Sequence, residues 1–141
     1  MKALSVLPPW WAMILHQGKD IENRTWPTNF RGTIYLHVGK KFEHAEIVAD
    51  LHRIAHEMPG VEVPAYCDPL NADRLLMRLR RSSGCIVGRV DIVGCVQRSD
   101  SPWFFGPYGF QLANPVAFER PIPYRGERGL FDVPDGIEVG R

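Results

Sequence analysis

Three charged side chains stand close together near the start of the chain, and their types and spacing suit chemistry. Lys19, Glu22 and Arg24 lie in a short stretch that ends at Trp26. Charged groups are costly to bury, so most stay at the surface. Here they alternate with residues expected to face a core, which predicts a polar pocket supported by a sheet. In such a pocket Lys19 would bind a phosphate or a reacting carbonyl, and Glu22 would accept hydrogen bonds or a proton.

The directions of these side chains follow in part from strand geometry. Side chains alternate between the two faces of a strand, so Glu22, Arg24 and Trp26 share one face. Lys19 lies where a helix is expected to give way to the strand, and alternation does not fix its direction. The structural alternative is a Glu–Arg ion pair at the mouth of a barrel, which often contributes little to stability. The clustering of charges favours the functional pocket.

Aromatic side chains are numerous for a chain of this length. Trp10 follows two prolines that open a predicted helix, and Trp103 and Tyr108 belong to an aromatic loop. Either tryptophan could stack on a nucleobase, an interaction worth roughly 1–3 kcal/mol. Core packing is the alternative for both tryptophans, and the sequence does not separate the two.

A further basic group surrounds a predicted strand. Arg31 precedes the strand, His37 lies near its end, and Lys40 follows beside Lys41. These residues could form a phosphate-binding rim, with His37 facing the anion. The alternatives are a solvated charged surface for the cations and a satisfied core position for the histidine.

The elements that must position these residues are short strands with helices between them. Alternating apolar residues predict strands, and apolar residues at three- and four-residue steps predict helices. The predicted strands cover residues 2–7, 19–26, 32–38, 85–97, 110–118 and 130–133. The predicted helices cover residues 8–18, 42–58 and 71–82. We expect an α+β fold, a small mixed β-barrel, closed or half-closed, of about six strands with inserted helices.

Glycines and prolines punctuate these predicted elements. Gly88 and Gly94 lie inside a strand and predict bulges or a close approach of the backbone. Pro115 is expected to interrupt the strand that contains it. Loops or turn-rich connections are expected at residues 61–70, 99–109 and 121–126.

Length and composition indicate one domain over residues 1–141. The formal net charge is +1, so overall charge does not by itself indicate a nucleic-acid binder. No apolar run is long enough to cross a bilayer and no signal peptide is evident, so we expect a cytoplasmic protein without a membrane partner. The cysteines Cys67, Cys85 and Cys95 form no CxxC pair and are expected to be reduced thiols. No metal site and no cofactor are expected, and oligomeric state is not predicted.

Several short motifs occur in a recognisable order along the chain. They are Pro9-Trp10-Trp11-Ala12, Gly18-x-x-x-Glu22-Asn23-Arg24-x-Trp26, Arg31-Gly32, Ile34-x-x-His37, Gly84-Cys85-Ile86 and Ser101-Pro102-Trp103. This pattern resembles the ASCH domain, a family of the PUA-like superfamily. The resemblance implies a β-barrel with a cleft, and a role in recognising RNA or modified nucleosides. Some members of the family look like small hydrolases that act on an acetylated cytidine or on RNA.

Three functions agree with these residues. The first is an RNA- or modified-nucleoside-binding module whose cleft is lined by Lys19, Glu22 and Arg24. The second is a small metal-independent hydrolase, a nucleoside amidohydrolase or ribonuclease, in which Lys19 and Glu22 are catalytic. The third is an adaptor that binds protein through the aromatic loop over residues 103–108. A nucleophile beside Lys19 would favour the second function. None is obvious from the sequence, although the fold could bring one of four hydroxyl side chains there: Ser5, Thr25, Thr28 or Ser101.

Overall fold

The computed structural model describes residues 1–58 and 69–138. Within these residues the chain forms six strands in one sheet, and three helices. The strands are β1 (Lys2–Val6), β2 (Ile21–Arg24), β3 (Gly32–Val38), β4 (Cys85–Val96), β5 (Tyr108–Pro123) and β6 (Leu130–Asp132). The helices are α1 (Trp10–His16), α2 (His44–Glu57) and α3 (Pro69–Arg81).

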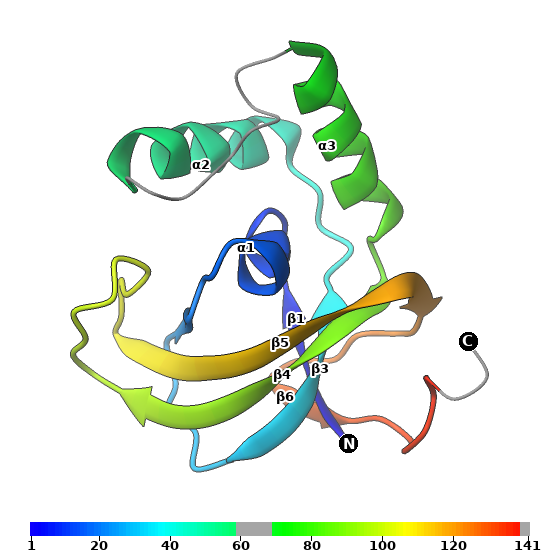
Figure 1. The fold of residues 1–141 in the computed structure, drawn as a ribbon. Coiled ribbons are helices and arrows are strands. Elements are labelled where there is room, and N and C mark those ends of the chain that lie inside the picture. The colour runs from blue at the N-terminus through cyan, green and yellow to red at the C-terminus, as the bar shows by residue number, and fades with distance from the viewer. Residues whose placement is uncertain (59–68, 139–141) are drawn as a thin grey trace.

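The six strands make a curled half-barrel. Their order is β2-β5-β4-β3-β1-β6. β1 and β3 run parallel, and the other four neighbouring pairs run antiparallel. Figure 1 shows the sheet curving beneath the three helices, with α1 nearest to the strands. The predicted α+β fold, a half-closed mixed barrel with inserted helices, is confirmed.

The sheet buries apolar side chains on both faces. Leu4 of β1 and Leu36 of β3 pack in the larger core cluster together with Ile14 of α1. Ala3 and Tyr35, one position away on the same strands, pack in a second cluster with residues near the C-terminus. Successive side chains of a strand point to opposite faces, so β1 and β3 each contribute to both clusters. Full burial of one leucine contributes about 1.5–3 kcal/mol, so both clusters stabilise the sheet.

Gly88 and Gly94 lie where β4 and β5 approach each other closely. A Cβ atom on Gly88 would collide with the main-chain oxygen of Val116, and one on Gly94 would collide with the side chain of Gln111. The pairing register between the two strands also shifts next to both glycines. The predicted bulges and close approach are confirmed at both positions.

β5 is longer than the sequence predicts. It runs without a break from Tyr108 to Pro123, so it begins in a predicted loop and ends in a predicted turn-rich connection, and both of those boundaries are wrong. Pro115 does not end the strand, because it falls in a bulge between the paired residues Ala113 and Val116. A proline has no N–H to donate, and a bulge leaves its residue unpaired. A second register shift accommodates the next proline in the same way.

The remaining element ends differ from prediction by a few residues. β2 is shorter than the predicted strand over 19–26, and α3 begins at Pro69, before the predicted start. Proline fits the first turn of a helix, because the N–H that it lacks would have no partner there. Cys85 and Cys95 are free thiols, whereas Cys67 lies outside the described residues, as does most of the predicted loop over 61–70. Among the helices described, none is long and apolar enough to cross a membrane.

Candidate ligand-binding site

A turn after α1 directs Lys19 into the protein. Gly18 has a φ of +73°, a left-handed conformation that glycine readily adopts after a helix. The N–H of Lys19 then donates to the carbonyl of Met13, at 3.1 Å. As a result Lys19 is buried, with 3% of its surface exposed. This turn settles the direction that strand alternation leaves open.

Glu22 lies between two cations at the start of β2. Its Oε1 is 3.4 Å from Lys19 Nζ, and its Oε2 accepts a hydrogen bond from Arg24 Nη2 at 2.8 Å. Lys19 also donates to the carbonyl of Ile21, and Arg24 Nη2 donates to the carbonyl of Ser5 at 2.6 Å. Burial lowers the pKa of the Lys19 ammonium, and the Glu22 carboxylate opposes that shift. Lys19, Glu22 and Arg24 thus form one hydrogen-bonded group, the charge cluster.

A pocket of about 590 Å³ opens beside the charge cluster. Its size is typical of sites for small ligands. The end of β1, the start of α1, β2, α2 and the loop before β5 all contribute to it. Besides the charge cluster, its walls include Ser5, Trp10, Asn23, Trp26, Arg53 and Phe105.

Two aromatic rings and an arginine form another part of this wall. The guanidinium carbon of Arg53, on α2, is 5.6 Å from the centre of the Trp10 ring and 5.3 Å from the centre of the Phe105 ring. Lys19 Nζ is 5.9 Å from the centre of the Trp10 ring. Cations at such distances are attracted to the faces of aromatic rings. The pocket therefore combines flat aromatic surfaces with positive charge, which suits a planar, anionic ligand.

Asn23 ties the aromatic loop to β2. Its Oδ1 accepts hydrogen bonds from the N–H groups of Phe105 and Gly106, at 2.8 Å and 3.0 Å. Its Nδ2 donates to the carbonyl of Trp103 at 3.0 Å. The loop backbone is fixed by these bonds, while the Phe105 ring stays at the surface with 53% of the residue exposed. A ligand can therefore reach this ring without moving the loop.

Five of the residues expected from the sequence meet in this pocket. They are Trp10, Lys19, Glu22, Arg24 and Trp26. Sequence reasoning missed Arg53, because α2 shows only a general amphipathic pattern and nothing in it marks one arginine. It also missed the role of Phe105, although the aromatic loop that contains this residue stands out in the sequence.

The other two aromatic candidates do not line the pocket. Trp103 is 3% exposed and packs in the larger core cluster, so its ring is not available for stacking. Tyr108 is the first residue of β5 and pairs with Arg24 across the two strands. For Trp103 the structure thus favours core packing, the alternative that the sequence left open.

His37 has the contacts of a core histidine. Its Nδ1 is 2.8 Å from Ser5 Oγ, and its Nε2 is 2.7 Å from the carbonyl oxygen of Tyr124. Only 2% of the residue is exposed, and burial lowers the pKa of the imidazole. Both ring nitrogens are therefore satisfied inside the protein, and His37 does not line the pocket.

Arg31 and Lys40 do not form one rim. They lie at opposite ends of β3, a strand that spans roughly 20 Å. Arg31 is exposed and donates to the carbonyls of Thr28 and Phe30, at 3.1 Å and 2.8 Å. Lys41 is 3.6 Å from the carboxylate of Glu46. None of these three cations lines the pocket.

Comparison with known proteins identifies a family whose domain includes both the pocket and the charge cluster. The model of the ASCH domain matches residues 4–127, which include every pocket residue named above. The chain belongs to the ASCH domain family. The resemblance expected from the sequence is thereby confirmed. Activating signal cointegrator 1 of Homo sapiens is 25% identical over 150 residues, which cover 97% of this chain and 23% of that protein. The ASCH chain thus spans about a quarter of the length of this relative.

Proposed function

We propose that this ASCH domain binds single-stranded RNA and holds one nucleotide in the pocket beside the charge cluster. Membership of the ASCH family suggests RNA binding. The observation that carries the proposal is the meeting of aromatic faces and buried hydrogen-bonding charges in one pocket of suitable size. Unstacked bases are recognised by stacking and by hydrogen bonds to their edges, and the pocket offers both.

Each wall of the pocket has a part in this binding. A base stacks on Trp10 or Phe105, either displacing Arg53 from the rings or lying on its guanidinium plane. The Glu22 carboxylate accepts a hydrogen bond from the edge of the base, and Arg24 donates one. Whether or not the base displaces it from the rings, the Arg53 guanidinium lies where it can neutralise a phosphate. A modified nucleoside would use the same groups as a free ligand.

The affinity of a short single-stranded RNA tests the stacking wall. Phe105 and Val93 are exposed to similar extents, 53% and 55%, but only Phe105 lines the pocket. Phe105→Ala is expected to weaken binding about tenfold, the effect of losing one stacked base. Val93→Ala is the matched control and should bind as the wild type does. Equal affinities for the two variants in a fluorescence anisotropy titration would contradict the proposed site.

Mass spectrometry separates binding from hydrolysis. Lys19 and Glu22 lie close enough to exchange a proton, so the hydrolase alternative uses the same pocket. Short RNAs and acylated nucleosides that are recovered unchanged after incubation with the wild-type protein would support the binding function. Turnover of either substrate would contradict a function in binding alone and would support the hydrolase function. The cytoplasmic location and the single domain over residues 1–141 stay predictions.

A further inference from the structure

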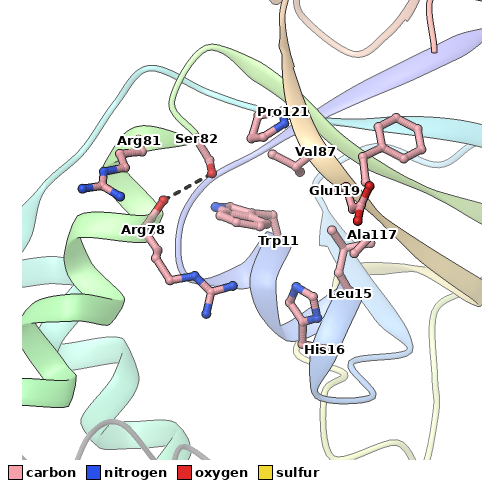
Figure 2. A pocket seen from close by; sticks show the side chains of 11 residues that line it. Trp11, Leu15, His16, Arg78, Arg81, Ser82, Val87, Ala117, Glu119 and Pro121 are labelled. Atoms are coloured by element: carbon pink, nitrogen blue, oxygen red, sulfur yellow. Dashed lines mark hydrogen bonds between the residues drawn. The ribbon is translucent and has the colours of Figure 1, made fainter. Parts of the chain in front are cut away.

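A second pocket lies between α1, α3 and β5 (Figure 2). Its volume is about 370 Å³, and it shares no residue with the pocket beside the charge cluster. α1 contributes Trp11 and His16, α3 contributes Arg78 and Arg81, and β5 contributes Glu119. The proposed RNA site makes no use of these side chains.

Trp11 brings an unpaired hydrogen-bond donor to this pocket. The residue is 7% exposed, and its Nε1–H has no hydrogen-bond partner among the described residues. Buried donors nearly always have a partner, and the missing partner is often a solvent molecule or a ligand. Figure 2 shows the indole ring extending toward Arg78 of α3 and toward Ser82, which follows the helix. An acceptor atom at this end of the pocket would satisfy the indole.

The cations of the pocket are not neutralised by ion pairs. Within the described part of the chain, neither Arg78 nor Arg81 has a carboxylate partner, and Glu119 has no basic partner. In Figure 2 the guanidinium of Arg78 turns toward Trp11 and His16, whereas that of Arg81 turns away. Burial, and secondarily the charge of Arg78, lowers the pKa of the His16 imidazole. The pocket thus receives one guanidinium, that of Arg78, which has no ion-pair partner among the described residues.

We propose that this pocket binds a phosphate group, with Trp11 and Arg78 as its principal hydrogen-bond donors. One phosphate oxygen accepts from Trp11 Nε1, and the others pair with the Arg78 guanidinium, a geometry that arginine forms readily with phosphate. Trp11 Nε1 is shielded by its neighbours, and the exposed Arg78 side chain swings toward the ligand to complete the site. Ser82 Oγ donates to the Arg78 carbonyl at 3.2 Å, which holds the end of α3 in place. The phosphate is either a free one or part of a nucleic-acid chain.

Nuclear magnetic resonance reports on the proposed donor directly. The protein has four tryptophans, and Trp11→Phe identifies the Trp11 indole signal by its loss. Inorganic phosphate, and separately sulfate, is titrated into the full chain. We expect a saturable shift of the Trp11 indole N–H signal. A Trp11 signal that stays unmoved by both anions would overturn the proposal.

Two arginine variants test specificity without needing an assigned spectrum. Arg78→Gln should weaken binding of inorganic phosphate at least about tenfold in calorimetry, because it removes a charge-assisted hydrogen bond. Arg74→Gln removes the same charge from an exposed position of α3 outside the pocket and should bind as the wild type does. Glu119→Gln removes the acidic group of the pocket and should tighten binding. Equal losses in Arg78→Gln and Arg74→Gln would show unspecific attraction and overturn the proposal.

Competition identifies the source of the phosphate group. A short RNA is added to the phosphate-saturated Phe105→Ala protein, whose first pocket is impaired. A shift of the Trp11 indole signal from its phosphate-bound position to a third position would assign the pocket to the phosphates of a nucleic-acid chain. A Trp11 signal that keeps its phosphate-bound position would assign it to free phosphate. Failure of the proposed RNA site leaves the titration with inorganic phosphate unaffected, so the two proposals can fail separately.

Discussion

Trp10 and Trp11 are neighbours in α1, but their rings line two different pockets. Successive residues of a helix point about 100° apart, so one short helix can form a wall of both sites. Ile14 of the same helix is 1% exposed and packs in the larger core cluster, which fixes the helix against the sheet. Both proposed sites therefore depend on the placement of α1.

The charge cluster is expected to be important for stability. Glu22→Gln keeps the shape of the side chain but leaves Lys19 and Arg24 without their counter-charge. Removing one member of a buried ion pair typically costs about 3–5 kcal/mol of unfolding free energy. Arg24 is partly exposed, which places the expected loss at the lower end of that range. Chemical denaturation followed by circular dichroism measures it.

A surface carboxylate supplies the control for this prediction. Asp132 is 2.8 Å from Lys2 Nζ in an exposed ion pair, and Asp132→Asn makes the same carboxylate-to-amide change. Exposed pairs contribute little, so this variant should unfold as the wild type does. A loss in Asp132→Asn as large as that in Glu22→Gln would show that burial is not the cause.

The aromatic loop should become mobile when Asn23 is shortened. Asn23→Ala removes the acceptor of the Phe105 and Gly106 N–H groups and the donor to the Trp103 carbonyl. We expect faster hydrogen exchange at the amides of Phe105 and Gly106, and weaker RNA binding because Phe105 loses its fixed position. Asn29→Ala, at an exposed position outside the pocket, is the control. Unchanged exchange in Asn23→Ala would mean that other contacts hold the loop.

Sequence patterns predicted the sheet and the helices because these depend on local periodicity, whereas the direction of Lys19 follows from the turn at Gly18. Glu22, Arg24 and Trp26 were placed together by strand alternation alone. Arg53 could not be placed in the pocket in this way, because only tertiary packing brings α2 over the Trp10 ring of α1. A tryptophan in a loop looks the same in sequence whether it faces the core or a ligand, so the role of Trp103 stayed open until its burial was known, and Phe105 was not singled out.

Residues of like charge that are near in sequence can also lie far apart in the structure. Arg31 and Lys40 look like one basic group, but the whole length of β3 separates them. His37 looked like an anion-binding residue, but its partners come from β1 and from the segment after β5, which no local pattern predicts. The length of β5 was underestimated because prolines normally end strands, and the bulges that accommodate them are set by pairing with β4.

Stability should fall in mild acid because of His37. Burial holds the pKa of its imidazole below the usual value of 6.5. Below pH 6.5 the unfolded chain therefore takes up a proton that the folded protein resists, and stability is lost as pH falls through the folded-state pKa. His37→Gln should reduce the difference in unfolding free energy between pH 7.5 and pH 5. The difference that remains should be roughly that caused by the other titratable groups. His44→Gln, at an exposed position of α2, should keep the wild-type difference.

RNA affinity should depend on salt through Arg53. A protein that neutralises phosphates loses affinity as salt rises, and each contact adds about one unit to the slope. Arg53→Gln should lower the slope by about one unit, whereas Arg31→Gln, outside the pocket, should leave it unchanged. Single strands should bind more tightly than duplexes, because paired bases cannot stack on Trp10 or Phe105. A titration series across salt concentrations gives both results. Equal slopes in all three proteins would remove Arg53 from the phosphate contacts.

Photochemical cross-linking of single-stranded RNA to the wild-type protein tests the central claim most directly. A base that stacks in the pocket lies against an aromatic ring, so irradiation should join it to that ring, and mass spectrometry of the digested protein locates the bond. The account predicts cross-links at Trp10 or Phe105, with the signal lost when the RNA is duplexed. Cross-links confined to residues outside the pocket beside the charge cluster would contradict it.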